Sequence, residues 1–600
     1  MSSNLAGTFH WHYEMGDSGR PEPVHRNVRH KTRLFGQSHW VNGLTELRDV
    51  LEIMEPLLRD GTRKASYNLQ RCKSLAKIIK ARRAPTWPTP PTSDIPPKEV
   101  ADTLIECYLR TFETIYRVLH VPSFRRDYEA LWVSETEPNT AFLVQLKLIL
   151  ALGTIAHDEQ FSLRTSAVRW VYEAQTWLSE PEFKSRLNIQ FLQTNILLLL
   201  ARENIGVNGG SAWISAGVIL RIAVLMGLHQ DPACLPQGTT FALEMRRRMW
   251  NVVLEITLQS SMEGGAPPLL SLDDFDTEPP GNFDDDQLMA QDPIPKSEHE
   301  FTGMSMVIAL RKMFPLRLAI LKYLNGLSSH STYDQTLRFD AQIRASYKTL
   351  CQILQQYKST SGASPSRFEI CTLDSLMCRY LSALHVPYLG AAIHEIAYAY
   401  SRKVVVETAL KAWYVMYPPS PSVVMAASRP DPGSFSRDDF ARFVTCGSGQ
   451  HRHIAVQACY HIVIELKTQL QQEDSLGPVP LRPDLLAVLH DAKAWFIQSI
   501  RAGETSIKCY MFMDIVFALL DGLSRGVAKD ELPEMLVTAA EEAEDVCLPI
   551  LEQMAGQSQF EESFDELDNI SGTELPDFMD GWDFMMPDAS FDFGITVPTS

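Results

Sequence analysis

Length, composition and charge define the broad class of the protein. The chain has 600 residues, 45% of them hydrophobic and 21% charged, which is typical of a globular protein with a large core. Its formal net charge of −18 is unevenly distributed, because Asp530–Ser600 contains 19 acidic residues and no Lys or Arg. The other 529 residues carry 55 basic and 54 acidic side chains. We therefore predict a nearly neutral body followed by an acidic tail.

Neither a membrane span nor a secretion signal is expected. The most apolar windows, 141–156 and 189–201, contain polar residues and are shorter than the ~20 apolar residues that cross a bilayer. The first 20 residues lack a basic segment followed by an apolar one. Ten cysteines without a C-x-x-C pair favour a reducing compartment, and we expect Cys371 and Cys378 to be core residues.

Residues 1–83 are predicted to form a basic N-terminal segment, with 15 Lys and Arg against 8 Asp and Glu. An apolar seam with helical spacing predicts a short helix that packs onto the body or pairs with a partner helix: Leu44, Leu47, Leu51, Met54 and Leu58. A basic group further on fits either a nuclear import signal or an ordinary solvated helix: Lys77, Lys80, Arg82 and Arg83. Six prolines in the 13 residues from Pro85 predict an extended linker over residues 84–97.

Helical periodicity dominates from residue 98 to about residue 530. The apolar pattern predicts helices over 101–119, 141–156, 189–201, 211–228, 244–262, 304–324, 341–357, 373–399, 453–471, 485–500 and 506–523. Irregular insertions are expected over 264–286 and 417–439, and no fixed repeat is present. The predicted fold class is therefore all-α: a large irregular multi-helix domain over 98–530, with an acidic terminal helix over 531–555.

Catalytic and metal-binding motifs are missing from the sequence. His394-Glu395 is not followed by a second His one turn later, because Tyr398 stands at that position. Phosphate-binding and dinucleotide-binding glycine motifs and the G-x-S-x-G motif are absent. The pair His451 and His453 lacks a third ligand, so we expect solvent-exposed or capping roles, with adventitious metal affinity as the alternative. We therefore expect no enzyme activity, no cofactor and no metal, and keep a helical enzyme as a remote alternative.

Three blocks of sequence, in this order, carry a family resemblance. They are 110–132 (RTFETIYRVLHVPSFRRDYEALW), 211–232 (SAWISAGVILRIAVLMGLHQDP) and 244–283 (EMRRRMWNVVLEITLQSSMEGGAPPLLSLDDFDTEPPGNF). Together they resemble the fungal-specific transcription factor domain, the regulatory middle region of fungal binuclear zinc cluster transcription factors. Residues 31–40 (KTRLFGQSHW) are similar to a short motif that many of those proteins carry before this domain.

The blocks also suggest roles for individual side chains. In 211–228 we expect one apolar face to pack against the body, with Arg221 opposite it: Ile214, Val218, Ile222 and Leu225. By the family resemblance, at least one arginine of a triplet should pair with an acid of the following loop: Arg246, Arg247 and Arg248 with Asp273, Asp274 or Asp276. Contact of the triplet with phosphate or a partner is the alternative.

Two features depart from the family pattern. No cysteine precedes Lys31, so the six-cysteine cluster that reads DNA in these proteins is missing. The sequence therefore does not predict direct DNA binding by the residues present, and we expect contact through a DNA-bound zinc cluster partner, a homodimer or an upstream zinc cluster. The family's Gly-Arg-Pro appears as Gly264-Gly265-Ala266-Pro267-Pro268, which removes an arginine.

The acidic tail is predicted to be an activation segment over 556–600. Seven aromatic residues alternate with acids from Phe560 onward, and repulsion between like charges would keep the segment disordered and its aromatic rings available to a coactivator groove. Its expected core is 577–586, with these contact residues: Phe578, Trp582, Asp583, Phe584 and Met585. The alternative is a merely solubilising tail.

These observations together lead to one functional hypothesis and one alternative to it. The hypothesis is a nuclear, non-enzymatic transcription regulator, an activator of a pathway-specific gene set such as a secondary-metabolite cluster, that binds transcriptional coactivators. The alternative is an adaptor that senses a small-molecule effector and has no DNA-binding activity of its own.

Overall fold

The computed structural model describes the chain over several ranges: 9–14, 24–30, 33–133, 138–181, 183–207, 212–234, 238–326, 332–360, 364–418, 438–471 and 481–556. Its fold class is all-α, as predicted. A small antiparallel sheet with strand order β1-β2-β3 precedes the helices: β1 (Phe9–Glu14), β2 (Val24–His30) and β3 (Arg33–Phe35). This sheet was not predicted from the sequence.

The N-terminal helices bury the predicted apolar seam. They are η1 (Trp40–Leu47), α1 (Arg48–Arg59) and α2 (Lys64–Arg83). All five seam residues are at most 7% exposed and belong to the main core. The prediction that this seam packs onto the body is therefore confirmed.

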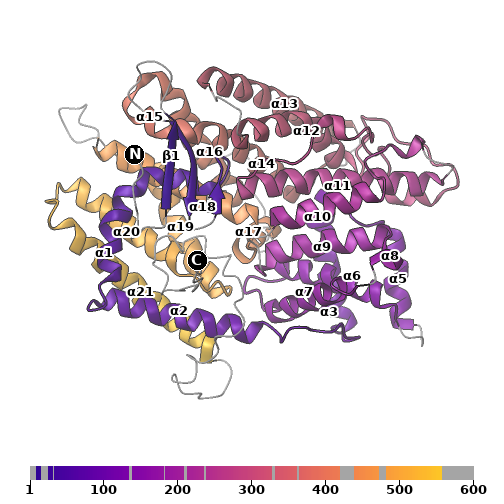
Figure 1. Ribbon diagram of the computed structural model, residues 1–600, viewed down its shortest axis with the longest axis horizontal. Helices are drawn as coiled ribbons and strands as arrows, with labels where there is room; N and C mark the ends of the chain where they lie inside the picture. Colours follow the sequence, from indigo (N-terminus) through magenta and orange to yellow (C-terminus); the bar gives the residue numbers. More distant parts are fainter. Residues whose placement is uncertain are drawn as a thin grey trace, which may run out of the picture.

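The middle of the chain forms a stack of helices, which Figure 1 shows in purple and magenta. They are α3 (Lys98–Arg110), α4 (Phe112–Tyr116), α5 (Val121–Val133), α6 (Thr140–Gly153), α7 (Arg164–Leu178), α8 (Phe183–Arg186), α9 (Ile189–Ile205), α10 (Ala212–Leu225), α11 (Thr240–Gly264), α12 (Ser305–Asn325) and α13 (Tyr333–Thr360). Short 3-10 turns lie between them: η2 (Thr154–Ala156), η4 (Pro232–Cys234), η5 (Leu272–Asp274) and η6 (Asp285–Met289).

The C-terminal third completes the helical body. Its elements are α14 (Arg367–His385), η7 (Val386–Tyr388), α15 (Leu389–His394), η8 (Ile396–Tyr398), α16 (Ala399–Met416), α17 (Asp439–Cys446), α18 (Gln450–Gln471), α19 (Pro483–Arg501), α20 (Lys508–Ser524) and α21 (Leu532–Gly556). Helix α2 lies beside α21, and η1 lies beside α18, so the two ends of the described chain pack together (Figure 1). One continuous core therefore includes residues on both sides of the proline-rich segment 84–97.

Local sequence signals fix the ends of the helices that carry the sites below. Asn188 caps α9 by accepting a hydrogen bond from the Phe191 amide, and Ser366 forms a capping box with Glu369 at the start of α14. Gly206 ends α9 in the left-handed region, with φ 83°. These caps fix where α9 begins and ends and where α14 begins.

Most predicted helices are present, with two breaks. The helix predicted over 101–119 divides into α3 and α4 at Thr111, whose φ and ψ of −117° and −93° are not helical. The helix predicted over 373–399 ends at His385, because Pro387 follows and the chain continues in short turns. Both Cys371 and Cys378 are buried, as predicted. Helices α5, α7, α8, α16 and α17 were not predicted, and an ordinary helix was one of the two interpretations of the basic group that lies on α2.

Of the four residues predicted to form the buried face of α10, Ile222 is buried, but the other three are exposed. Ile214, Val218 and Leu225 are 64%, 50% and 66% exposed, whereas the helix buries another face that includes Ile219 and Ala223 against α9 and α11. Nearly every position of α10 is apolar, so periodicity alone could not select the buried side.

Residues 31–40 contain a docking contact with the end of α11. The amide of Gly36 donates to the carbonyl oxygen of Gly265 at 2.9 Å, and a Cβ atom on Gly36 would lie 2.3 Å from that oxygen. Gly265 has φ 59°, which favours glycine. The Ser38 hydroxyl donates to the Met262 carbonyl at 2.9 Å, and Arg379 donates to the Ser38 carbonyl at 2.6 Å. The motif therefore joins α11 to α14.

Among the helices that the structure describes, none combines the length and the apolar character needed to cross a membrane.

Candidate functional site

The arginine triplet at the start of α11 holds surrounding loops to the body. Arg247 forms a two-pronged ion pair with Asp231, through Nε at 3.0 Å and Nη2 at 2.9 Å, and also donates to Glu244 at 2.9 Å. Arg246 donates to the Met226 carbonyl at 2.9 Å. The Arg247 hydrogen bond outweighs burial and lowers the pKa of Asp231 to about 2. This aspartate is therefore ionised at neutral pH.

Arg248 is almost fully buried and pairs with a carboxylate at the end of the following loop. Its Nη1 atom donates to Asp285 at 2.6 Å, and both side chains are at most 8% exposed. Asp285 also accepts from Arg117 at 2.8 Å and from the Val121 amide at 2.9 Å. Burial raises the pKa of Asp285, but the charges of Arg248 and Arg117 prevail and lower it. We call Arg247, Arg248, Asp231 and Asp285 the loop anchor.

The predicted carboxylate partners of the triplet are replaced by others. Asp274 accepts from the backbone of its own turn at Ser271, Asp276 accepts from the Asp231 amide at 2.7 Å, and Asp273 is exposed. Asp274 is engaged locally because a short aspartate side chain in a 3-10 turn bonds to nearby amides, whereas Asp285 lies farther along the chain and accepts from Arg248. Asp231 and Asp285 were not predicted as partners, although Asp231 stands in the second recognised block.

The basic group on α2 lies against the C-terminal helices. Arg82 donates to the Ala555 carbonyl, and Arg83 donates to the Gly503 carbonyl at 2.7 Å. Lys77 is exposed and Lys80 is half-buried. The predicted activation residues lie outside the described residues: Phe578, Trp582, Asp583, Phe584 and Met585.

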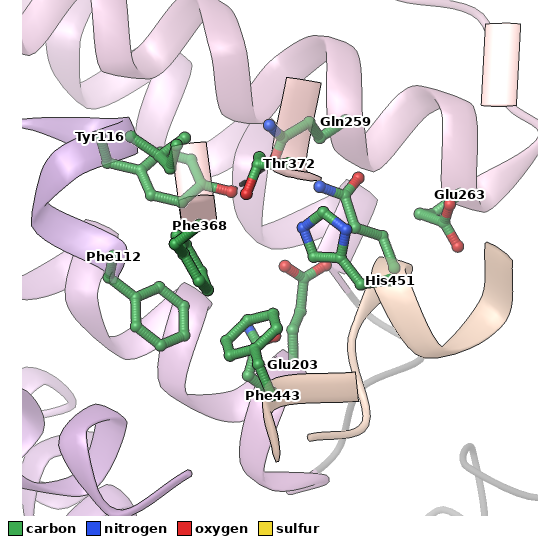
Figure 2. Close-up of a pocket in the computed structure, with 12 residues that line it drawn as sticks. Phe112, Tyr116, Glu203, Gln259, Glu263, Phe368, Thr372, Phe443 and His451 are labelled. Carbon is green, nitrogen blue, oxygen red and sulfur yellow. Dashed lines mark hydrogen bonds between the residues drawn. The ribbon is translucent and has the colours of Figure 1, made fainter. Parts of the chain in front are cut away.

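A cavity lies where helices from the middle and the C-terminal third meet, and we call it the central cavity (Figure 2). Water-sized groups can occupy about 30 Å³ of it. Its lining comes from α4, α9, α11, α14, α17 and the start of α18: Phe112, Ile115, Tyr116, Glu203, Asn204, Gln259, Glu263, Phe368, Thr372, Phe443, Gln450 and His451. The lining thus combines aromatic rings with two carboxyl groups.

The pKa values of the two carboxyl groups in the central cavity shift in opposite directions. Burial, reinforced by the negative charge of Glu263, raises the pKa of Glu203 to about 8. Burial also acts on Glu263, but its hydrogen bond to His453 at 2.8 Å and the charge of Arg379 lower its pKa to about 2. No hydrogen bond or ion pair to Glu203 is present among the residues that the structure describes.

The surface role predicted for the histidine pair is wrong for His451. This residue is 6% exposed and lines the central cavity, and burial lowers its pKa to about 4. The side chain of His453 is 35% exposed and pairs with Glu263. The prediction failed for His451 because its side of α18 faces other helices. Within the described ranges, no group of three His, Cys, Asp or Glu side chains is arranged to hold a metal ion.

The described part of the chain is a large helical body in which buried ion pairs hold the loops around α11. The model of the fungal specific transcription factor domain matches residues 105–355. The chain belongs to this family of fungal transcription factors and is a transcription regulator.

Three relatives show how far the similarity extends. Transcription factor opdR of Penicillium oxalicum is 30% identical, over 93% of this chain and 73% of the relative. Transcription factor lepE of Aspergillus flavus is 27% identical, over 92% and 68%. The aspyridones cluster regulator apdR of Emericella nidulans is 28% identical, over 64% and 50%. No solved structure matches the chain. The similarity to the first two relatives therefore includes regions on both sides of 105–355.

Proposed function

We propose that the protein is a nuclear activator of a pathway-specific gene set, such as a biosynthetic gene cluster for a secondary metabolite. Family membership supports gene regulation, and the name of the aspyridones cluster regulator supports a cluster as the target. The observation that carries the activating role is the composition of 556–600, in which aromatic and acidic residues alternate. This composition suits capture by a basic-rimmed apolar groove on a transcriptional coactivator.

The body serves as a non-enzymatic scaffold in this proposal. Its buried ionic groups are used to hold loops, as Asp231 and Asp285 do in the loop anchor. DNA contact is made through a DNA-bound zinc cluster partner, through a homodimer, or by an upstream zinc cluster.

Import into the nucleus uses the basic group on α2, and replacing Lys77 and Lys80 by Ala in a fluorescent fusion should shift the protein towards the cytoplasm.

A reporter assay tests the activating role. Residues 556–600 are fused to a heterologous DNA-binding domain, and reporter output should rise above that of the bare domain. Trp582→Ala combined with Phe584→Ala should remove most of this output, because the rings supply the apolar contact. Phe591→Ala combined with Phe593→Ala, outside the proposed core, is the matched control and should retain it. Output equal to that of the bare domain would refute the activating role.

Ligand sensing is a second candidate function, because the central cavity contains a carboxyl group without a partner among the described residues.

A further inference from the structure

The central cavity contains two polar groups that lack partners within the part of the chain that the structure describes. Glu203 makes no hydrogen bond or ion pair there; it is half-buried and lines the cavity, towards which Figure 2 shows its carboxyl group directed. The Thr372 hydroxyl is buried and has no hydrogen-bond partner there. Buried polar groups are normally satisfied, so an unpartnered hydroxyl beside an unpaired carboxyl group indicates an occupant of the cavity.

The hydrogen bonds around His451 determine which of its ring nitrogens can accept. The Ser375 hydroxyl donates its single proton to the Thr372 carbonyl at 3.0 Å. With that proton engaged, we assign the His451 Nδ1 atom, 3.1 Å from the same hydroxyl oxygen, as the protonated nitrogen that donates to it. Because burial keeps this imidazole neutral at pH 7, Nε2 then retains its lone pair. His451 lines the cavity, and its Nε2 atom has no hydrogen bond among the described residues, so this nitrogen is available as an acceptor.

Three phenylalanine rings form another part of the wall. The ring of Phe443 lies 5.1 Å from that of Phe112 and 5.6 Å from that of Phe368, measured between centroids, and all three rings line the cavity. The faces of such rings carry partial negative charge and attract cations. A carboxyl group and a nitrogen lone pair, with aromatic rings beside them, favour an occupant that is a hydrogen-bond donor and positively charged.

The size of the cavity limits the occupant. A water molecule needs roughly 10–15 Å³ by this measure, so 30 Å³ holds about two water-sized groups. Ammonium and methylammonium have one and two heavy atoms, whereas a quaternary ammonium group is too large. The three N–H donors of a primary ammonium group suit the Glu203 carboxylate, His451 Nε2 and the Thr372 hydroxyl oxygen.

We propose that the central cavity binds a primary ammonium group, carried by the ammonium ion or by a short primary amine, with Glu203 as its counter-ion. This proposal is independent of the acidic tail and of any target gene. The empty cavity holds a neutral carboxyl group. When the ammonium group binds, the proton of Glu203 is released to solvent and the carboxylate pairs with the bound cation.

The charged and titratable groups around Glu203 predict how binding depends on pH. They are Arg202 on α9, Tyr116 on α4, Glu263 on α11 and His451 on α18. Tyr116 stays neutral because burial raises its pKa, Glu263 stays ionised and His451 stays neutral. Glu203 is therefore the group among them that titrates between pH 6.5 and pH 8.5. Affinity for methylammonium should rise about tenfold or more over this range.

Calorimetry and thermal melting of the full chain test the proposal. Methylammonium chloride and ammonium chloride should raise the melting temperature at pH 8.5, relative to sodium chloride at equal ionic strength. Titration at pH 7 in two buffers of different ionisation enthalpy should show release of about one proton per amine bound. Glu203→Gln should weaken binding at least tenfold and abolish proton release.

Glu544→Gln is the matched control. Glu544 on α21 is fully buried and its pKa is also raised to about 8, mainly by burial, but it does not line the central cavity. This variant should bind methylammonium as the parent does. Equal stabilisation by potassium chloride or tetramethylammonium chloride would overturn the assignment to a primary ammonium group. An unchanged affinity in Glu203→Gln, or no binding at all, would show that the cavity holds only water.

Discussion

Asp231 and Asp285 in the loop anchor and Glu203 in the central cavity are all withdrawn from bulk water, yet their pKa values move in opposite directions. The aspartates accept hydrogen bonds from Arg247 and Arg248, and their pKa values fall. Glu203 has the negative Glu263 nearby, and its pKa rises to about 8. Burial acts in the same direction on all three, so the neighbouring charge decides the outcome. Asp231 and Asp285 therefore hold loops to the body as paired carboxylates, whereas Glu203 has no hydrogen-bond or ion-pair partner among the described residues.

The largest expected effect comes from breaking the loop anchor at its most buried point. Arg248→Met leaves Asp285 buried with Arg117 as its remaining cation, and should lower the free energy of unfolding by about 3 kcal/mol. Denaturant-induced unfolding at pH 7 measures this loss. A loss below about 1 kcal/mol would mean that the loop anchor contributes no more than a surface ion pair.

The next largest effect is expected at Glu203 in the central cavity, where a substitution should stabilise the protein instead of destabilising it. The folded pKa of Glu203, about 8, lies above the ordinary value of 4.5, so this carboxyl group destabilises the folded state increasingly as pH rises from 4.5 to 8. Glu203→Gln should therefore match the parent near pH 4.5 and be more stable by about 2 kcal/mol at pH 8, below the full shift because one side faces the cavity. Unfolding curves at the two pH values check this. A variant less stable than the parent at pH 8 would indicate a hidden partner for Glu203.

Asp231 provides the contrasting pH dependence. Its folded pKa of about 2 lies below the ordinary value of 3.8, so its contribution is fully present above about pH 3.8 and is lost as the pH falls through 2. Asp231→Asn should lower the free energy of unfolding by about 2 kcal/mol at pH 7. The difference in the free energy of unfolding between variant and parent should become smaller at pH 3. A difference that is independent of pH would mean that the effect arises from packing instead of charge.

The smallest effect is expected at an exposed ion pair. Arg125 and Glu106 are 2.7 Å apart, but their side chains are 52% and 53% exposed. Arg125→Met should change the free energy of unfolding by about 0–1 kcal/mol, and added salt should remove the change. This variant is the control for Arg248→Met, since both replace an arginine that is paired with a carboxylate. If Arg125→Met and Arg248→Met lowered the free energy of unfolding equally, burial would not be the reason why the ion pair of Arg248 is the stronger one.

The helices could be predicted because their signals are local. The spacing of Leu44, Leu47 and Leu51 predicted a buried seam, and these residues are in the core. The arginine triplet was correctly singled out, but its partners were not, because Asp231 and Asp285 approach it through the fold. The exposed face of α10 was mistaken for a buried one, since an almost wholly apolar helix gives periodicity no side to choose.

By itself, the sequence determined the all-α class, most of the helices, the buried cysteines and the resemblance to fungal transcription factors, because periodicity, caps and ordered blocks can be read along the chain. Only the tertiary structure decided which charges meet. Glu203 and His451 are 248 residues apart in the sequence and line one cavity, whereas Asp273 and Asp274 lie near the arginines in sequence without pairing with them. The energy of a buried charge depends on its neighbours in space, and those neighbours come from helices whose packing no local pattern records.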